Sequence, residues 1–296
     1  MTVLAAIPTE RVEELRRDRE HGASWMARRA VEALVEVSKQ PTVSAEELLA
    51  NLVAAGRDLA ASRPGVGAIA GAVGRLLAAA HGQGHLEPDQ LRRVVEEEAE
   101  ALVEGRRRAA ASIAIQLRER LQEAIVLTHS ASATVREALL KTPPERVLCT
   151  VSSPFEEGRA FAEELAGSGL DVELIEDVEG PEALATASLF LVGADTVFRD
   201  GTLCNKVGTN RLAAAAAEEL VPMVVACEVI KLAPVEATHA PGLAGIAHDL
   251  FDFTPPELID SVVTEEGAFA GEEIRTLVDR TPFLRDGYAL LHPDVG

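Results

Sequence analysis

Small hydroxyl side chains follow the first apolar run in the second half of the chain. Thr128-His129-Ser130 comes directly after that run, and Ser132 precedes a segment with helical spacing. If the run is a strand, the free backbone N–H groups and the dipole of the following helix favour an anion such as phosphate. Plain N-capping by Ser130 or Ser132 is the alternative, and on these residues alone it is the stronger interpretation.

An acidic residue, Asp195, ends a very apolar run that we predict to be a strand. A carboxylate in that position usually serves hydrogen bonding or proton transfer, because its burial without a partner is costly. Further along, we predict a helix that begins at Lys206. A lysine at a helix N-terminus opposes the helix dipole unless an anion lies nearby. Asn205 and Lys206 are therefore candidate anion ligands, and the alternative is that they only cap and stabilise the helix.

Charged residues after two other apolar runs leave two interpretations open. Arg159 could reach a phosphate, or it could pair with Glu156 or Glu163. Glu228 and Lys231 could pair with each other or face the same cleft. Neither group decides the chemistry by itself.

These residues can act together only if the fold brings their loops to one edge. Residues 1–122 show helical spacing alone, which predicts an all-helical N-terminal domain. Residues 123–296 alternate short β-rich runs with helical segments, which predicts an α/β domain with a parallel sheet and helices on its faces. Ligands of such sheets bind beyond the carboxyl ends of the strands. The predicted helices are 9–20, 24–38, one opening at Ser44 with Glu47 in a capping pattern, 68–80, 88–122, 134–140, 157–166 and 206–220, and the predicted strands are 124–127, 147–151, 172–175, 189–192 and 223–226.

Composition excludes several classes of protein. The chain has 48 acidic and 28 basic residues, and its net charge of -20 argues against DNA or an anionic membrane as a partner. Only four of the basic residues are lysines, which together with the many alanines is typical of a salt-loving microbe. Cys149, Cys204 and Cys227 are widely spaced, and the histidines show no metal spacing, so we expect neither a disulfide framework nor a metal. We found no secretory leader and no membrane-length apolar run, and we expect a soluble cytoplasmic protein.

Several segments taken together resemble one family. They are similar, in order, to the alpha, beta and delta regulatory subunits of eukaryotic translation initiation factor 2B. Archaeal homologues and the isomerases of methylthioribose 1-phosphate and ribose 1,5-bisphosphate belong to the same family. The matching segments are Thr128-His129-Ser130, Gly193-Ala194-Asp195, Asn205-Lys206-x-Gly208-Thr209, Phe251-Asp252-x-Thr254-Pro255-Pro256-Glu257-x-Ile259-Asp260, Thr264-Glu265-Glu266-Gly267 and, more weakly, Gly22-Ala23 and Ser62-Arg63-Pro64.

The resemblance implies a helical N-terminal domain and a Rossmann-like C-terminal domain. It also implies a homodimer or higher homo-oligomer formed through the C-terminal domain, an initiation factor as a possible partner, and a small phosphorylated ligand without any cofactor. Taken with the strand-end loops described above, it gives as candidate ligands of a sugar or nucleotide phosphate Gly22, Ala23, Ser130, Ser132, Asp195, Asn205 and Lys206.

The chain departs from the isomerases at positions that matter for catalysis. Asp195 matches their catalytic aspartate, but Ser130 stands where they have a catalytic cysteine, and a serine hydroxyl is a far weaker acid than a thiol. Ser153 and His21 replace two of their arginines, and Val151 replaces a glutamate. We therefore predict a regulatory protein that binds without catalysis. The alternatives are a ribose 1,5-bisphosphate isomerase that uses Asp195 as acid and base with Ser130 orienting the anomeric oxygen, and a scaffold without a ligand.

Overall fold

Helices alone make up the first part of the chain. The computed structural model describes residues 9–19, 21–240 and 249–293, so Glu20, the predicted end of the first helix, lies outside the described residues. Ser44 caps a helix as predicted: its hydroxyl accepts a hydrogen bond from the Glu47 N–H at 3.1 Å, and the Glu47 carboxylate accepts one from the Val43 N–H at 2.8 Å. The helices are α1 (Thr9–Arg17), α2 (Ala23–Ser38), α3 (Ala45–Ala61), α4 (Gly67–Gly82), α5 (Pro88–Gln116) and α6 (Arg118–Leu121).

The second part is built around a seven-stranded sheet with the order β11-β10-β7-β4-β1-β2-β3. All neighbouring pairs are parallel except β10 and β11. The predicted α/β class with a parallel sheet is confirmed, and five of the strands coincide with predicted ones to within a residue at each end. The strands of this sheet are β1 (Ile125–Thr128), β2 (Arg146–Thr150), β3 (Val172–Ile175), β4 (Leu189–Val192), β7 (Met223–Ala226), β10 (Ser261–Thr264) and β11 (Gly267–Phe269).

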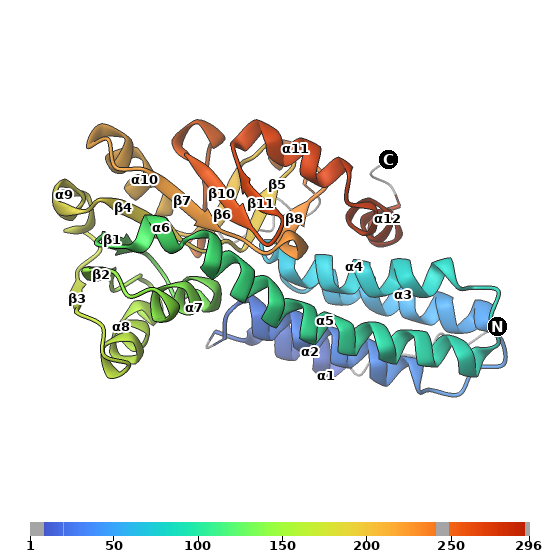
Figure 1. The fold of residues 1–296 in the computed structure, drawn as a ribbon. Coiled ribbons are helices and arrows are strands. Elements are labelled where there is room, and N and C mark those ends of the chain that lie inside the picture. Colours follow the sequence, from blue (N-terminus) through green and yellow to red (C-terminus); the bar gives the residue numbers. More distant parts are fainter. Residues whose placement is uncertain (1–8, 20, 241–248, 294–296) are drawn as a thin grey trace.

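Helices cover both faces of this sheet (Figure 1). One face packs on α5, α7 (Ala133–Lys141) and α8 (Glu157–Gly167), through side chains such as Val126 and Leu191. The other face packs on α10 (Thr209–Glu218) and α11 (Gly271–Asp279), through side chains such as Leu127 and Phe190. Neighbouring residues of one strand therefore belong to opposite cores, which explains why the strands are apolar throughout.

A small second sheet, absent from the prediction, changes the role of Lys206. Its order is β8-β5-β6-β9, and β6 (Leu203–Lys206) pairs antiparallel with β9 (Phe251–Thr254). The prediction that Lys206 begins a helix is therefore wrong, because Lys206 ends a strand. The helix α10 begins at Thr209, after Gly208 with a φ of 103°. The remaining short elements are β5 (Thr196–Phe198), β8 (Leu232–Ala233), α9 (Gly180–Ala183) and the 3₁₀ turns Leu184–Thr186, Val229–Lys231, Ala237–His239 and Pro256–Leu258.

The last helix, α12 (Pro282–Leu291), returns to the helical part and packs on α4 (Figure 1). The contact is close because two glycines face each other: a Cβ on Gly74 would lie 3.2 Å from the Gly287 backbone. Leu291 joins the core of the helical bundle. Residues from both ends of the chain therefore share one core, and the predicted domain boundary between residues 122 and 123 stays a prediction. No helix within the described ranges is long and apolar enough to span a membrane.

The close contact between Gly74 and Gly287 predicts that glycine-to-alanine substitutions at two positions change the unfolding free energy in opposite directions. In Gly287→Ala the new methyl group meets the Gly74 backbone and forces α12 away from α4, which should cost about 1–3 kcal/mol of unfolding free energy. Gly105→Ala, in the middle of α5, meets nothing within 4 Å and should stabilise by about 0.5–1 kcal/mol through helix propensity. Urea unfolding followed by circular dichroism measures both. Equal effects of the two substitutions would show that the α4–α12 contact is not close in solution.

Candidate functional site

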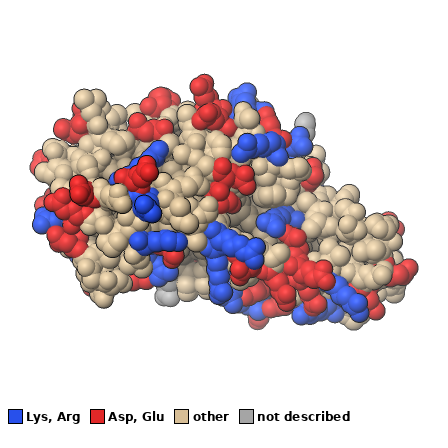
Figure 2. Space-filling model, in the orientation of Figure 1, with Lys and Arg blue, Asp and Glu red and all other residues tan. Residues whose placement is uncertain are grey.

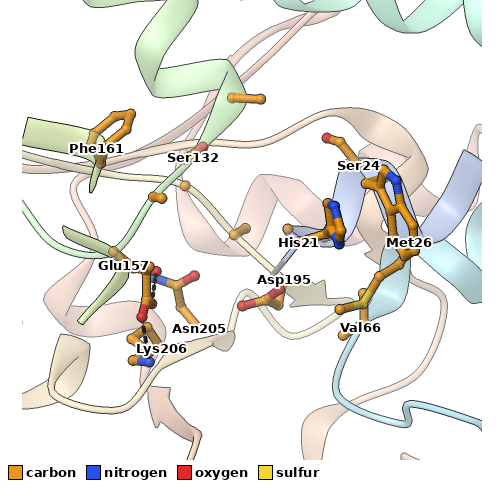
Figure 3. Close-up of a pocket in the computed structure, with 18 of the residues that line it drawn as sticks. His21, Ser24, Met26, Val66, Ser132, Glu157, Phe161, Asp195, Asn205 and Lys206 are labelled. Atoms are coloured by element: carbon orange, nitrogen blue, oxygen red, sulfur yellow. Dashed lines mark hydrogen bonds and ion pairs between the residues drawn. The ribbon is translucent and has the colours of Figure 1, made fainter. Parts of the chain in front are cut away.

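The carboxyl ends of the central strands open into one cavity of about 370 Å³. The sheet is extended in one direction by β2 and β3 and in the other by β4 and β7, so β1 and β4 flank the point where the order reverses. Ligands bind at that point in open α/β sheets. The start of α2 closes the cavity from the helical side (Figure 3). The structure brings into this one lining all seven predicted ligand residues, which are Gly22, Ala23, Ser130, Ser132, Asp195, Asn205 and Lys206.

Lys206 and Ser130 meet at a glutamate that sequence reasoning missed. The Lys206 ammonium lies 2.9 Å from Oε2 of Glu157 (Figure 3). The Ser130 hydroxyl donates to Oε1 of the same carboxylate at 2.7 Å. The Phe155 ring covers the ammonium, with its centroid 4.8 Å from Nζ. Asn205 donates instead to the Thr209 hydroxyl at 3.1 Å, so its side chain also supports the loop before α10.

The loop after β1 is held by buried hydrogen bonds. His129 Nε2 lies 2.9 Å from the Val207 carbonyl and Nδ1 lies 2.7 Å from the Thr150 hydroxyl. Burial lowers the pKa of His129, so the ring is neutral; Nε2 then donates to the carbonyl and Nδ1 accepts from Thr150. Ser130 follows with a φ of 67°, and its N–H donates to the Ser152 hydroxyl at 2.8 Å. The imidazole therefore positions the Ser130 backbone.

The capping interpretation holds for one of the two serines. Ser132 is the N-cap of α7, and its hydroxyl accepts from the Val135 N–H at 3.3 Å. Ser130 is not the N-cap of any helix in the described part of the chain. Ser132 also packs against Gly193, where a Cβ would lie 2.7 Å from the Ser132 Cβ. Gly193 at the end of β4 thus lets the two strand-end loops meet.

The carboxyl group of Asp195 faces the cavity just beyond the end of β4. Its backbone is fixed, because its carbonyl accepts from the Gly67 N–H and its own N–H donates to the Cys204 carbonyl. Among the described residues its carboxylate accepts no hydrogen bond. Burial raises the pKa of Asp195 to about 6, although the charges of Lys231 and Arg63 oppose that rise. Such a group can gain or lose a proton near neutral pH, which is the property of a general acid or base.

A buried ion pair fixes the helical wall of the cavity. Arg106 of α5 donates to Oε2 of Glu228 at 2.9 Å and to the Ser24 carbonyl at 2.6 Å, and it also bonds the Ser24 hydroxyl. Although burial opposes ionisation, Lys231 and Arg106 lower the pKa of Glu228. Lys231 itself donates to the Ala194 carbonyl at 2.9 Å. Glu228 thus pairs with Arg106, and Lys231 lines the cavity beside Asp195.

The helical side adds further cationic and aromatic groups to the lining. Arg63 donates to the main-chain carbonyls of Arg16 and Asp18. His21 stacks on Trp25 with ring centroids 4.0 Å apart. On the face shown in Figure 2, basic side chains gather between the helical bundle and the sheet although the whole chain is strongly acidic.

Arg159 and the three cysteines are not among the described residues that line the cavity. Arg159 pairs with Glu156 at 2.7 Å, as one of its two interpretations proposed, and with Glu176 at 3.4 Å. All three cysteines are buried, and none is among the described residues that line the cavity. Burial raises the pKa of Cys149 to about 12 and those of the other two cysteines as well. No described group of His, Cys, Asp and Glu has an arrangement that would hold a metal ion.

The N-terminus of helix α10 does face a carboxylate, but that carboxylate belongs to Asp252 of the same chain and not to a ligand. Oδ2 of Asp252 accepts from the Gly208 N–H at 2.7 Å and from the Asn210 N–H at 3.1 Å. The dipole argument for a ligand beside Lys206 therefore fails, and Lys206 remains a candidate only because its ammonium lines the cavity.

Known proteins resemble this chain over most of its length. A protein of Pyrococcus horikoshii named translation initiation factor eIF-2B subunit 2-like is 31% identical over 273 residues, which cover 87% of this chain and 94% of that protein. A ribose 1,5-bisphosphate isomerase of Haloferax volcanii is 29% identical over 298 residues, with 87% of each chain covered. A solved tetrameric eIF2B-β2δ2 complex of C. thermophilum shares the fold, with a TM-score of 0.78, 22% identity, and coverage of 92% of this chain and 93% of that one.

The family model described as the initiation factor 2 subunit family matches residues 19–243, which hold the whole lining of the cavity apart from Leu250 and Phe251. Together with the relatives and the shared fold, this match shows that the chain belongs to the initiation factor 2 subunit family.

Proposed function

We propose that this chain is an initiation factor 2B-like regulatory protein that binds a sugar or nucleotide phosphate in the cavity without catalysis. One observation carries the proposal: the cavity presents a buried lysine and a serine at the reversal point of the sheet, and the described residues of its lining include no thiol. Lys206 and Ser130 offer an ammonium and a hydroxyl for phosphate oxygens, and Arg63 and Lys231, which also line the cavity, add positive charge. Hydroxyl groups of the ligand can bond to Asn205 and Asp195.

We also propose that the chain acts in the cytoplasm as a homodimer or higher homo-oligomer formed through its C-terminal part. The solved C. thermophilum relative is a tetramer of two kinds of subunit. A translation initiation factor is the macromolecular partner that the names of the relatives favour. Ligand binding between the helical wall and the sheet would then change the surface offered to such a partner.

A second function, isomerisation of ribose 1,5-bisphosphate, has one observation in its favour. The pKa of Asp195, about 6, suits a group that moves a proton between the two carbons of an aldose–ketose pair. The Haloferax volcanii relative bears the name of this activity. Against it stands Ser130, whose hydroxyl already donates to Glu157 and is a far weaker acid than a thiol.

Turnover separates the two functions. The protein is incubated with ribose 1,5-bisphosphate in concentrated potassium chloride and followed by phosphorus NMR, with the Haloferax volcanii isomerase as the active control. We expect a ligand-dependent change in the resonances, which shows binding, and no ribulose 1,5-bisphosphate. Its formation would make the protein an isomerase, and the absence of any binding would remove both functions.

The proton affinity of Asp195 can be measured without any ligand. Because its pKa rises from 3.8 to about 6 on folding, the folded chain holds this proton more tightly than the unfolded chain. The stabilisation from this group is complete below about pH 4 and is lost as the pH rises through 6. Asp195→Asn is neutral throughout, so its unfolding free energy relative to the wild type should increase by about 2–3 kcal/mol between pH 4 and pH 7.5.

The comparison uses urea unfolding at both pH values, with Asp58→Asn, at an exposed position of α3, as the control for loss of one charge. A difference between Asp195→Asn and the wild type that does not change with pH would show that Asp195 has an ordinary pKa, and the isomerase alternative would lose its supporting observation.

A further inference from the structure

The carboxylate of Glu157 occupies the place in which Lys206 and Ser130 could together hold an external anion. Both of its oxygens are used, one by the Lys206 ammonium at 2.9 Å and the other by the Ser130 hydroxyl at 2.7 Å. A phosphate group would need the same two donors in the same orientation, because its oxygens accept hydrogen bonds as carboxylate oxygens do. The chain therefore carries its own anion at this point of the cavity (Figure 3).

The two partners of this ion pair are unequally buried. The Lys206 side chain is 7% exposed, whereas that of Glu157 is 27% exposed. Moving the glutamate into solvent costs it little, because its carboxylate regains water. The lysine would then remain as a buried cation without a counter-ion, which is strongly unfavourable until another anion takes the place. Exchange of one anion for another is thus the favourable route, with Lys206 as the fixed partner.

The backbone below Glu157 is fixed, so that only its side chain needs to move. The next residue, Gly158, donates its N–H to the Val151 carbonyl at 3.1 Å. A Cβ at Gly158 would overlap the Thr150 carbonyl oxygen, so the first turn of α8 packs directly on the end of β2. Rotation of the Glu157 side chain can vacate the donors without moving the helix.

We propose that Glu157 is an internal competitor for the anion site formed by Lys206 and Ser130, so that a phosphorylated ligand binds there by displacing this carboxylate. The inference rests on the proposed function, because it concerns the same cavity and ligand class. It makes Glu157 a specificity-determining residue: a monovalent anion gains no charge advantage over the carboxylate, whereas a phosphate dianion brings a second charge and a third oxygen.

The test compares three variants with the wild type. Glu157→Gln keeps the shape of the side chain and removes its charge. Glu156→Gln removes the same charge one residue earlier, where the carboxylate pairs with Arg159 outside the cavity. The double variant Glu157→Gln with Lys206→Met removes the proposed docking cation as well. Dissociation constants for ribose 1,5-bisphosphate and inorganic phosphate are measured by isothermal titration calorimetry in potassium chloride, after thermal unfolding has shown that each variant is folded.

We expect Glu157→Gln to bind both probes about tenfold more tightly than the wild type, Glu156→Gln to stay within about twofold, and the double variant to lose the gain. Binding by Glu157→Gln alone, with none detectable in the wild type, would support the proposal equally. A wild type that binds, with Glu157→Gln binding no tighter, overturns the inference and leaves the proposed function intact. If neither protein binds either probe, the proposed function fails and the inference falls with it.

Discussion

The pair formed by Arg106 and Glu228 connects the helical bundle to the sheet at the wall of the cavity. Arg106 comes from the long helix α5 and also holds Ser24 at the start of α2, while Glu228 follows the central strand β7 and accepts from Thr134 of α7. Removing one member of a buried ion pair typically costs about 3–5 kcal/mol, because the other charge is left in a medium of low polarity. The position of α2, and with it the depth of the cavity, depends on this pair.

Sequence reasoning located the sheet and the edge at which the cavity opens for a simple reason. Strands that are buried on both faces are apolar throughout, so runs such as 189–192 stand out, and polar residues after them must lie at the carboxyl edge. It missed Arg106 because the pair depends on a contact 122 residues away, and Arg106-Arg107-Arg108 has the pattern of a solvated helix surface. Sequence reasoning also missed Glu157, because its neighbour Glu156 has the same charge and faces outward, and nothing in the sequence distinguishes the two.

The error at Lys206 has a physical cause of the same kind. The alanine-rich segment after it favours a helix, and local propensity extended that helix backwards to residue 206. Residues 203–206 instead pair with Phe251–Thr254. The local sequence around residue 206 does not indicate a strand that pairs with a segment so far along the chain. Helix propensity was overridden by long-range pairing, and Gly208, with its positive φ, supplies the turn that separates strand from helix.

Cationic side chains in the lining of the cavity are partly neutralised by carboxylates of the same chain. The chain is strongly acidic overall, yet arginines and lysines line its cavity, and two of these already pair with an internal carboxylate: Lys206 with Glu157 and Arg136 with Glu164. Under the proposed function, an anionic ligand would replace these internal partners and would also have to overcome the field of the acidic surface, so its affinity would be a difference between two similar sets of contacts. Asp195 is the exception: its carboxylate accepts no hydrogen bond from the described part of the chain, and burial raises its pKa to about 6. In the proposed binding protein, protonation of Asp195 and release of Glu157 from Lys206 would each change the affinity for a phosphorylated ligand, because both set the charge that the cavity offers to an anion.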